Sequence, residues 1–308
     1  MPGNIGALSG IIKAKLMSLS QSEVEASIST ACQKSLRIVS SRPCPGGSIN
    51  DCQIVSVDDG REFFLKTNKA AQSLTGMFEL EFKALLLLSQ ACVIRVPQPL
   101  LYTDKYIVME TFVVGQQAGN WAELMGRQLA QLHKATANNS YGFEADNYLG
   151  TTLQKNTWCE SWMEFWRENR LATQLNSFAN KSSVDDRLLR LGWKLVDKLD
   201  SILGQVRTPA ALLHGDLWSG NASADEKGEP VIFDPAIYYG HNEAEIGMMR
   251  MFGGFGPRCE AAYVEIWPFD DDSERRIDLY RLYHELNHLN LFGNSYYDSC
   301  LSTLKTLL

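Results

Sequence analysis

HGDLWSGN, at residues 214–221, is the most informative segment of this 308-residue chain, and VIFDP follows it at residues 231–235. The spacing D-x-x-x-x-N from Asp216 to Asn221 lets one loop place a carboxylate and an amide on the same side. A short hairpin after the loop is expected to return Asp234 to face Asn221. Three side chains that carry oxygen ligands are therefore predicted to converge.

This trio fits the requirements of phosphoryl transfer from a nucleotide. The reaction needs a carboxylate that accepts the proton of the substrate hydroxyl, and an Asn and an Asp that hold the magnesium ions bridging the phosphates. Asp216 is the candidate base, and Asn221 and Asp234 are the candidate Mg²⁺ ligands, because magnesium prefers oxygen donors. A plain turn capped by Asn221 would explain the first segment alone, but not the second segment at this distance. The pattern indicates an enzyme that uses ATP and Mg²⁺.

The N-terminal third supplies a matching lysine and carboxylate. Lys66 ends a predicted strand, and the predicted helix after it carries FELE at residues 78–81. In kinases a strand lysine pairs with the phosphates, and a helix glutamate holds that lysine. We assign Lys66 and Glu81 to these two catalytic roles, with Glu81 preferred to Glu79.

A glycine-containing turn, PGGSIN at residues 45–50, lies between the first two predicted strands. Backbone N–H groups of such a turn can contact phosphate oxygens. The turn matches neither a Walker A sequence nor the G-x-G-x-x-G loop, so a plain hairpin remains an alternative. The adenine base is expected against the backbone where the next apolar strand ends. The predicted nucleotide-binding residues, besides Lys66, are Gly46, Gly47, Ser48, Met109, Glu110 and Phe112.

Periodicity divides the chain into a strand-rich part and a helix-rich part, joined by the small-residue connection VGQQAG at residues 114–119. The predicted strands are 35–40, 52–57, 62–67, 106–110 and a pair at 211–213 and 231–233. The predicted helices are 76–90, 121–136, 158–178, 185–203 and 271–291. We therefore expect an α+β fold with two lobes. Residues 1–113 would form a nucleotide-binding lobe with an antiparallel sheet and one helix, and residues 114–308 a mostly helical catalytic and substrate-binding lobe.

The bulk composition excludes several classes of protein. A formal net charge of -7 argues against a nucleic-acid partner, because such binding depends on clustered Lys and Arg. No apolar run approaches the roughly 20 residues of a membrane span, and the N-terminus lacks the pattern of a signal peptide. The seven cysteines are odd in number and form no C-x-x-C pair, which is typical of the cytoplasm or another reducing compartment.

Taken together, these residues resemble the fructosamine-3-kinase, or ketosamine 3-kinase, family of the aminoglycoside and choline kinase-like superfamily. The resemblance spans roughly residues 38–308 and rests on HGDLWSGN with its Trp, FDPA at 233–236, YGHNE at 239–243, MFGGF at 251–255 and LNHLNLFG at 286–293. It implies a protein-kinase-like fold. It also implies phosphorylation of the 3-hydroxyl of fructosamine or ribulosamine adducts, free or protein-bound, which repairs glycation. Ser48 stands where some relatives carry Cys, which leaves a redox role of the flanking Cys44 or Cys52 open.

Three residues are candidates for binding the substrate. Trp218 is predicted to offer an aromatic wall to the sugar ring, because apolar C–H faces pack on aromatic rings. Packing beneath the catalytic loop is the alternative for Trp218. His284 and His288 are candidates for a position near the substrate groove of the C-terminal lobe, and packing on a helix face with hydrogen-bonded imidazoles is the alternative.

Three other functions compete with this interpretation. HELNH at residues 284–288 matches the H-E-x-x-H motif of zinc hydrolases, but residues 289–308 contain no His or Glu that could be a third ligand. A kinase for aminoglycosides, choline or homoserine would carry the same catalytic residues. A nucleotide-binding pseudokinase is disfavoured, because every predicted catalytic and metal-binding residue is present.

Overall fold

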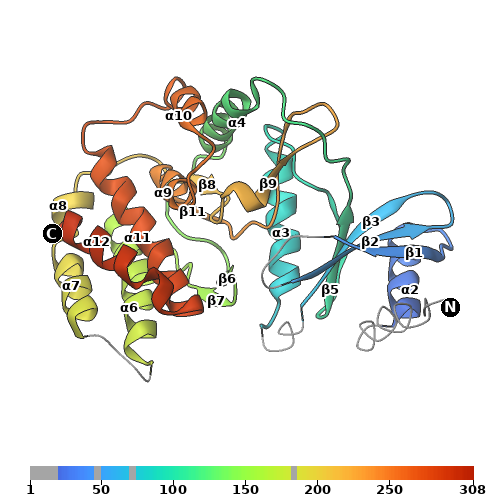
Figure 1. Ribbon diagram of the computed structural model, residues 1–308, viewed down its shortest axis with the longest axis horizontal. Coiled ribbons are helices and arrows are strands. Elements are labelled where there is room, and N and C mark those ends of the chain that lie inside the picture. The colour runs from blue at the N-terminus through green and yellow to red at the C-terminus, as the bar shows by residue number, and fades with distance from the viewer. Residues whose placement is uncertain (1–19, 45–49, 69–73, 182–185) are drawn as a thin grey trace, which may run out of the picture. The chain divides into compact units, whose positions relative to one another are not determined.

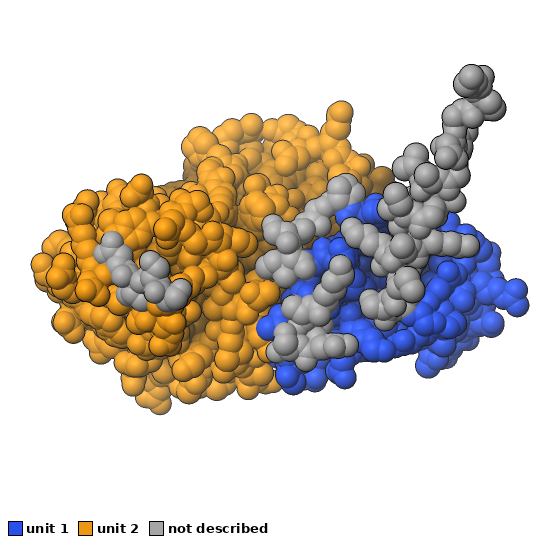
Figure 2. All heavy atoms as spheres, turned by 60° about the horizontal axis from the view of Figure 1, so that its bottom comes forward, with its two compact units in different colours: residues 1–82, 98–111 blue, residues 83–97, 112–308 orange. Residues whose placement is uncertain are grey.

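A five-stranded antiparallel sheet forms the framework of the first of two units into which the chain divides. The structure is a computed structural model, and it describes residues 20–44, 50–68, 74–181 and 186–308. Figure 2 distinguishes unit 1, which comprises Met1–Phe82 and Gln98–Thr111, from unit 2, which comprises Lys83–Pro97 and Phe112–Leu308.

The sheet of unit 1 has the strand order β1-β2-β3-β5-β4, and all neighbouring strands are antiparallel (Figure 1). Its strands are β1 (Ile38–Pro43), β2 (Asp51–Val57), β3 (Glu62–Thr67), β4 (Pro99–Tyr102) and β5 (Tyr106–Glu110). The predictions of β2, β3 and β5 are confirmed. The first strand begins at Ile38 rather than at Ser35, and the sequence analysis does not identify β4.

The core of unit 1 forms between the sheet and helix α2 (Gln21–Ala31). Val24 and Ile28 lie one helical turn apart, so both are buried on the face that meets the sheet. Val55 and Val57 of β2 are buried against them, as the two-residue period of a strand requires. The Asp-Gly hairpin predicted after β2 is present, with Gly60 at φ +88°.

Helix α3 (Met77–Gln90) confirms the helix predicted at residues 76–90. It begins directly after Gly76, which has φ +72°. The helix belongs to unit 1 as far as Phe82 and to unit 2 from Lys83 onward. The part of α3 in unit 1 therefore contributes Glu81.

Helices dominate unit 2 (Figure 1). α4 (Trp121–Ala135) packs against α10 (Pro257–Val264), and α11 (Ser273–Phe292) packs against α9 (Glu243–Met251) and α12 (Tyr297–Leu307). Glycines permit the closest approaches, because a Cβ at Gly126 would lie 1.9 Å from the carbonyl oxygen of Cys259 and one at Gly247 would lie 2.7 Å from the Cβ of Tyr280. The shorter helices are α5 (Trp162–Trp166), the π-helical turn η1 (Arg167–Leu171), α6 (Ala172–Ala179), α7 (Asp186–Asp197), α8 (Asp200–Leu203), and the 3-10 turns η2 (Ser219–Asn221) and η3 (Asn294–Tyr296).

Two of the predicted helices are interrupted. The helix predicted at residues 158–178 begins only at Trp162, and the wide turn η1 separates its α5 part from α6. The helix predicted at residues 185–203 is divided into α7 and α8. The apolar periodicity of the sequence does not reveal the interruption at η1. Residues of this wider π-helical turn are buried like those of the α-helices beside it, so the pattern of buried residues continues through the turn.

The predicted pairing of residues 211–213 with 231–233 is wrong. β8 (Ala211–Leu213) pairs with β11 (Tyr238–Gly240), whereas β10 (Pro230–Ile232) pairs with β9 (Ala222–Ala224). A short turn connects β9 to β10, so these two strands form a local hairpin. This hairpin takes the place of the predicted pairing between residues 211–213 and 231–233, which are farther apart in the sequence. β6 (Asn147–Leu149) and β7 (Thr152–Gln154) form a third short ribbon.

No helix in the described part of the chain is both long enough and apolar enough to cross a bilayer. No disulfide joins the cysteines of the described residues. Cys44 and Cys52 flank residues 45–49, which lie outside the described residues, and the backbone N–H of Cys44 donates to the carbonyl oxygen of Cys52 at 2.9 Å.

Candidate active site

The loop that follows β8 contains a glycine in a left-handed conformation, Gly215, and is held by hydrogen bonds of His214. Gly215 has φ +80°, and a Cβ there would lie 2.1 Å from the carbonyl oxygen of Ala236, so only glycine fits. His214 Nε2 donates to the carbonyl oxygen of Phe233 at 2.9 Å, and His214 Nδ1 accepts the backbone N–H of Asp216 at 3.3 Å. Burial lowers the pKa of His214, which keeps the ring neutral and its donor and acceptor in these positions.

Asp216, Asn221 and Asp234 come together in unit 2. The amide nitrogen of Asn221 donates to the carbonyl oxygen of Asp216 at 2.8 Å and to its carboxylate Oδ2 at 3.1 Å. The β9–β10 hairpin returns the chain so that the N–H of Phe233 donates to the backbone oxygen of Asn221 at 3.0 Å. Asp234 follows with φ +59°, a left-handed conformation that costs energy for a residue other than glycine and is frequent at functional sites.

Glu245 of α9 supports this loop, and sequence analysis does not identify it. Its two carboxylate oxygens accept the backbone N–H groups of His214 at 2.5 Å and of Gly215 at 3.1 Å. The residue is only 1% exposed, and His133 Nε2 lies 3.7 Å from its Oε2. The one available signal was an acidic residue at a position flanked by Ala244 and Ile246, within a mostly apolar helix.

Glu245→Gln is expected to lower the free energy of unfolding by about 1–3 kcal/mol, because one backbone N–H would face an amide donor instead of an acceptor. Urea denaturation measures the change. Glu265→Gln is the matched control, since Glu265 forms an exposed ion pair with Arg127 and should change stability by less than about 0.5 kcal/mol. Equal losses in both variants would contradict a supporting role for Glu245.

A second buried network holds the segment that follows Asp234. The amide nitrogens of Asn147 and Gln154 donate to the carbonyl oxygens of residues 237 and 236, at 2.7 Å and 3.0 Å. Arg170, fully buried in η1, places its guanidinium carbon 4.1 Å from the ring centroid of Tyr238. The loop at residues 214–221 and the Asp234 segment are thus held by partners from β6, β7, η1 and α9.

Unit 1 contains the predicted lysine–glutamate pair. Lys66 Nζ lies 2.9 Å from both carboxylate oxygens of Glu81, and the two residues are 3% and 7% exposed. Lys66 lies opposite Ile107 of β5 in the sheet, and Glu81 comes from the first half of α3. The ion pair forms with Glu81, the residue that the sequence analysis prefers to Glu79.

The other predicted nucleotide-binding residues are distributed over both units. Met109 and Glu110 end β5, where they lie opposite Phe64 and Phe63. Phe112 belongs to unit 2, where its ring centroid lies 6.3 Å from that of Phe233. Gly46, Gly47 and Ser48 lie outside the described residues.

Trp218, His284 and His288 belong to unit 2 and are linked through aromatic contacts. The Trp218 ring lies over Gly220, where a Cβ would be 2.3 Å from the indole. Its centroid is 5.2 Å from that of Phe252, which in turn is 5.3 Å from that of His288. His288 Nδ1 lies 2.8 Å from the carbonyl oxygen of His284.

The H-E-x-x-H segment does not assemble a zinc site. In the described part of the chain, no three His, Cys, Asp or Glu side chains form a group that could hold a metal ion. Glu285 accepts a hydrogen bond from Ser299 Oγ at 2.8 Å and pairs with Arg281. Burial holds the pKa of His284 well below its usual range, so this residue is a neutral interior imidazole.

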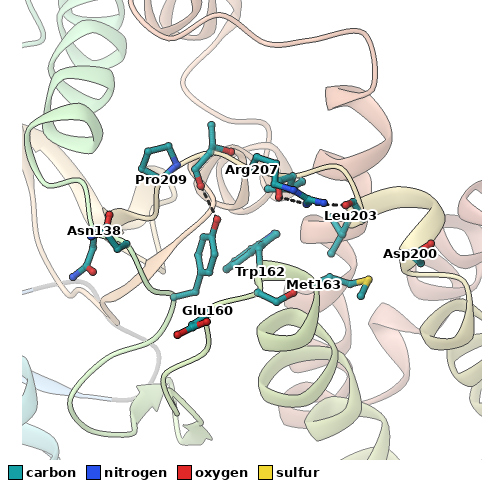
Figure 3. Close-up of a pocket in the computed structure, with 14 residues that line it drawn as sticks. Asn138, Glu160, Trp162, Met163, Asp200, Leu203, Arg207 and Pro209 are labelled. Atoms are coloured by element: carbon teal, nitrogen blue, oxygen red, sulfur yellow. Dashed lines mark hydrogen bonds between the residues drawn. The ribbon is translucent and has the colours of Figure 1, made fainter.

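A cavity of about 590 Å³ lies elsewhere in unit 2, and the residues that line it include none of the predicted site residues (Figure 3). Trp162 and Met163 at the start of α5 face it, as do Asp200 and Arg207 at α8 and the loop that follows. Tyr141 also lines it and donates its hydroxyl hydrogen to the carbonyl oxygen of Thr208 at 2.6 Å. The cavity is therefore separate from the convergence of Asp216, Asn221 and Asp234.

Known proteins resemble the chain over most of its length. The family model described as fructosamine kinase matches residues 20–308. The chain is 43% identical over 269 residues to the chloroplastic protein-ribulosamine 3-kinase of Arabidopsis thaliana, with 85% of this chain and 81% of that protein covered. It is 33% identical to the ketosamine-3-kinase of Mus musculus, with 85% of this chain and 93% of that protein covered.

A solved structure supports the same assignment. The crystal structure of a candidate fructosamine-3-kinase from Thermobifida fusca matches with a TM-score of 0.83 at 29% identity, and the match covers 92% of this chain and 98% of that chain. The predicted α+β, protein-kinase-like fold is thereby confirmed, and the protein is an ATP-dependent kinase that acts on a hydroxyl group. On these grounds the chain belongs to the fructosamine kinase family.

Proposed function

We propose that the protein transfers the γ-phosphate of ATP to the 3-hydroxyl of ketosamines, which are fructosamine or ribulosamine adducts of amines. The observation that carries this proposal is the convergence of Asp216, Asn221 and Asp234 in a chain of the fructosamine kinase family. Phosphorylation at this hydroxyl makes the bond between sugar and amine labile. The reaction therefore recovers the amine and repairs glycation.

Asp216 is the proposed base. Its carboxylate accepts the proton of the substrate hydroxyl while that oxygen forms a bond to the γ-phosphorus, the bond from the γ-phosphorus to the bridging oxygen breaks, and ADP leaves. The amide of Asn221 donates to Asp216, which holds the carboxylate in place and leaves Asn221 Oδ1 as the oxygen for a cation. Asn221 Oδ1 and the Asp234 carboxylate are the proposed Mg²⁺ ligands, and the ion would neutralise phosphate charge when bound.

Residues 1–113 are proposed to bind the nucleotide. Lys66 would pair with the phosphates and Glu81 would keep Lys66 in position, which the 2.9 Å ion pair supports. Gly46, Gly47 and Ser48 are proposed to contact phosphate oxygens through their N–H groups, and Met109, Glu110 and Phe112 to contact adenine. In functional terms, residues 1–113 form the nucleotide-binding lobe of this proposal and residues 114–308 the catalytic lobe.

The cellular setting is proposed to be reducing, as in the cytoplasm. The lack of disulfides among the described cysteines supports this setting. The net charge of -7 supports a partner that is a small-molecule or protein-bound ketosamine rather than a nucleic acid. A chloroplast stroma would meet the same chemical requirement.

A substrate screen tests the proposal. ATP consumption would be measured with and without Mg²⁺ in the presence of fructosyl-lysine, ribulosyl-lysine and a panel of aminoglycosides. Magnesium-dependent turnover of either ketosamine, with phosphate on the 3-hydroxyl by NMR, is the expected result. Turnover of aminoglycosides alone would instead assign the chain to the other small-molecule kinases, and metal-dependent hydrolysis without ATP would favour the zinc hydrolase alternative that the family comparison disfavours.

Trp218→Ala is expected to raise the KM for a ketosamine about tenfold or more and to change the KM for ATP little, because the indole would no longer cover the apolar face of the sugar. Steady-state kinetics with each substrate varied in turn measure both constants. Trp193→Ala, at a partly exposed position on α7, is the control for loss of a tryptophan. An unchanged ketosamine KM would assign Trp218 to packing beneath the loop.

A further inference from the structure

A row of aromatic rings continues from Trp218 across the surface of unit 2. We define the aromatic row as Trp218, Phe252, His288, Phe292 and Tyr296. Phe252 lies 5.2 Å from Trp218 and 5.3 Å from His288, and His288 lies 5.4 Å from Phe292 and 5.0 Å from Tyr296, between ring centroids. Phe252 is 37% exposed and Phe292 is 51% exposed, and the other three residues are partly exposed, so solvent reaches the row.

The row is assembled from segments distant in the sequence. Trp218 follows Asp216 in the catalytic loop, and Phe252 directly follows α9. His288 and Phe292 lie one turn apart on α11, and Tyr296 ends η3. One end of the row, Trp218, is therefore two residues from the proposed base in the sequence, and the other end lies on α11 and η3.

His288 supplies a hydrogen-bond acceptor in the middle of the row. Its Nδ1 lies 2.8 Å from the carbonyl oxygen of His284, and because a carbonyl oxygen only accepts, Nδ1 carries the hydrogen. Burial is the main cause that lowers the pKa of His288, so the imidazole is neutral at neutral pH. A neutral ring that is protonated at Nδ1 has a lone pair at Nε2.

These features match one chemical group of a ketosamine. Aromatic faces attract cations and cover aliphatic chains, and a neutral imidazole accepts a hydrogen bond from an ammonium without repelling it. The amine of a ketosamine is attached at C1, close to the reacting hydroxyl at C3, and it is protonated at neutral pH. An arm that starts at this amine must leave the site close to the base Asp216, and Trp218 of the row follows Asp216 by two residues in the same loop.

We propose that the aromatic row binds the amine-bearing arm of the ketosamine, namely its protonated amine and the aliphatic chain beyond it. The row then determines specificity for lysine-borne adducts over adducts of small amines. This inference rests on the proposed function. Trp218 covers the sugar, His288 Nε2 accepts from the ammonium, and Phe252, Phe292 and Tyr296 contact the chain.

The test compares two substrates that differ only in the arm, fructosyl-lysine linked through its ε-amine and the fructosyl adduct of methylamine. Phe292→Ser and Phe252→Ser remove rings at exposed positions, so both variants should keep the wild-type melting temperature. Each is expected to lower the ratio of kcat/KM for the lysine adduct to that for the methylamine adduct by about 5- to 30-fold.

His288→Phe keeps a ring but removes the hydrogen-bond acceptor, and it should raise the KM for both adducts. Trp193→Ser is the control at another exposed tryptophan and should leave the ratio unchanged.

The outcomes separate this inference from the proposed function. Wild-type turnover of both adducts, with an unchanged ratio in Phe292→Ser and in Phe252→Ser, would overturn the role of the row and leave the ketosamine kinase function intact. Wild-type turnover of neither adduct would overturn the proposed function and the inference with it. A fall of the ratio in both serine variants, with the control unchanged, supports the proposal.

Discussion

Asp216→Asn is expected to lower kcat by about 10²- to 10⁴-fold and to leave binding of Mg-ATP largely unchanged. The substitution keeps the size and shape of the side chain, and the new amide oxygen can still accept from the Asn221 amide, which lies 3.1 Å from Oδ2 in the structure. It removes the group that accepts the proton of the substrate hydroxyl. The loss should therefore appear in the chemical step rather than in nucleotide affinity.

Steady-state rates on a fructosamine and isothermal titration with Mg-ATP measure the two effects of Asp216→Asn separately. Asp271→Asn makes the same chemical change at an exposed carboxylate before α11 and should retain full activity. An Asp216→Asn enzyme with near wild-type kcat would refute the assignment of this loop to kinase chemistry.

Asp234→Ala is expected to fail in a different way, by weakening Mg-ATP binding and by lowering kcat/KM about 10²-fold or more. The carboxylate is a proposed metal ligand, and without it the charge between the β- and γ-phosphates is poorly neutralised, an interaction worth several kcal/mol. The rate should also require a higher Mg²⁺ concentration to reach its maximum. Isothermal titration at several Mg²⁺ concentrations, together with the rate, gives both quantities.

The left-handed backbone conformation of Asp234 makes a second variant necessary at this position. Its φ of +59° is tolerated by Asp and Asn but is strained for Ala, so Asp234→Ala could lose activity through the loop rather than through the metal. Asp234→Asn keeps a residue that accepts this conformation and removes only the negative charge. Retention of wild-type Mg²⁺ dependence by Asp234→Asn would argue against metal binding, and identical defects in Asp216→Asn and Asp234→Asn would argue against separate roles.

Much of the candidate site could be predicted from the sequence because its parts are close in the chain or follow strand ends. Asp216 and Asn221 are separated by one short loop, and their hydrogen bond is a consequence of that spacing. Lys66 at the end of β3 and Glu81 early in α3 are joined by a short connection, which explains why their ion pair could be anticipated. The strand-rich character of the first part and the helical character of the second also follow from local periodicity.

The sequence by itself thus determined the family, the α+β class and the polar residues that converge after β8 and β10. Only the tertiary structure decided which strands pair. β8 pairs with β11 and β9 pairs with β10, and the choice among possible partner strands depends on packing rather than on the strand propensity of each segment. The tertiary structure also decided that Glu245 holds the N–H groups of the catalytic loop, since no local pattern relates α9 to that loop. The aromatic row has the same origin: its rings come from the loop, α9, α11 and η3, and packing alone brings segments so distant in sequence into contact.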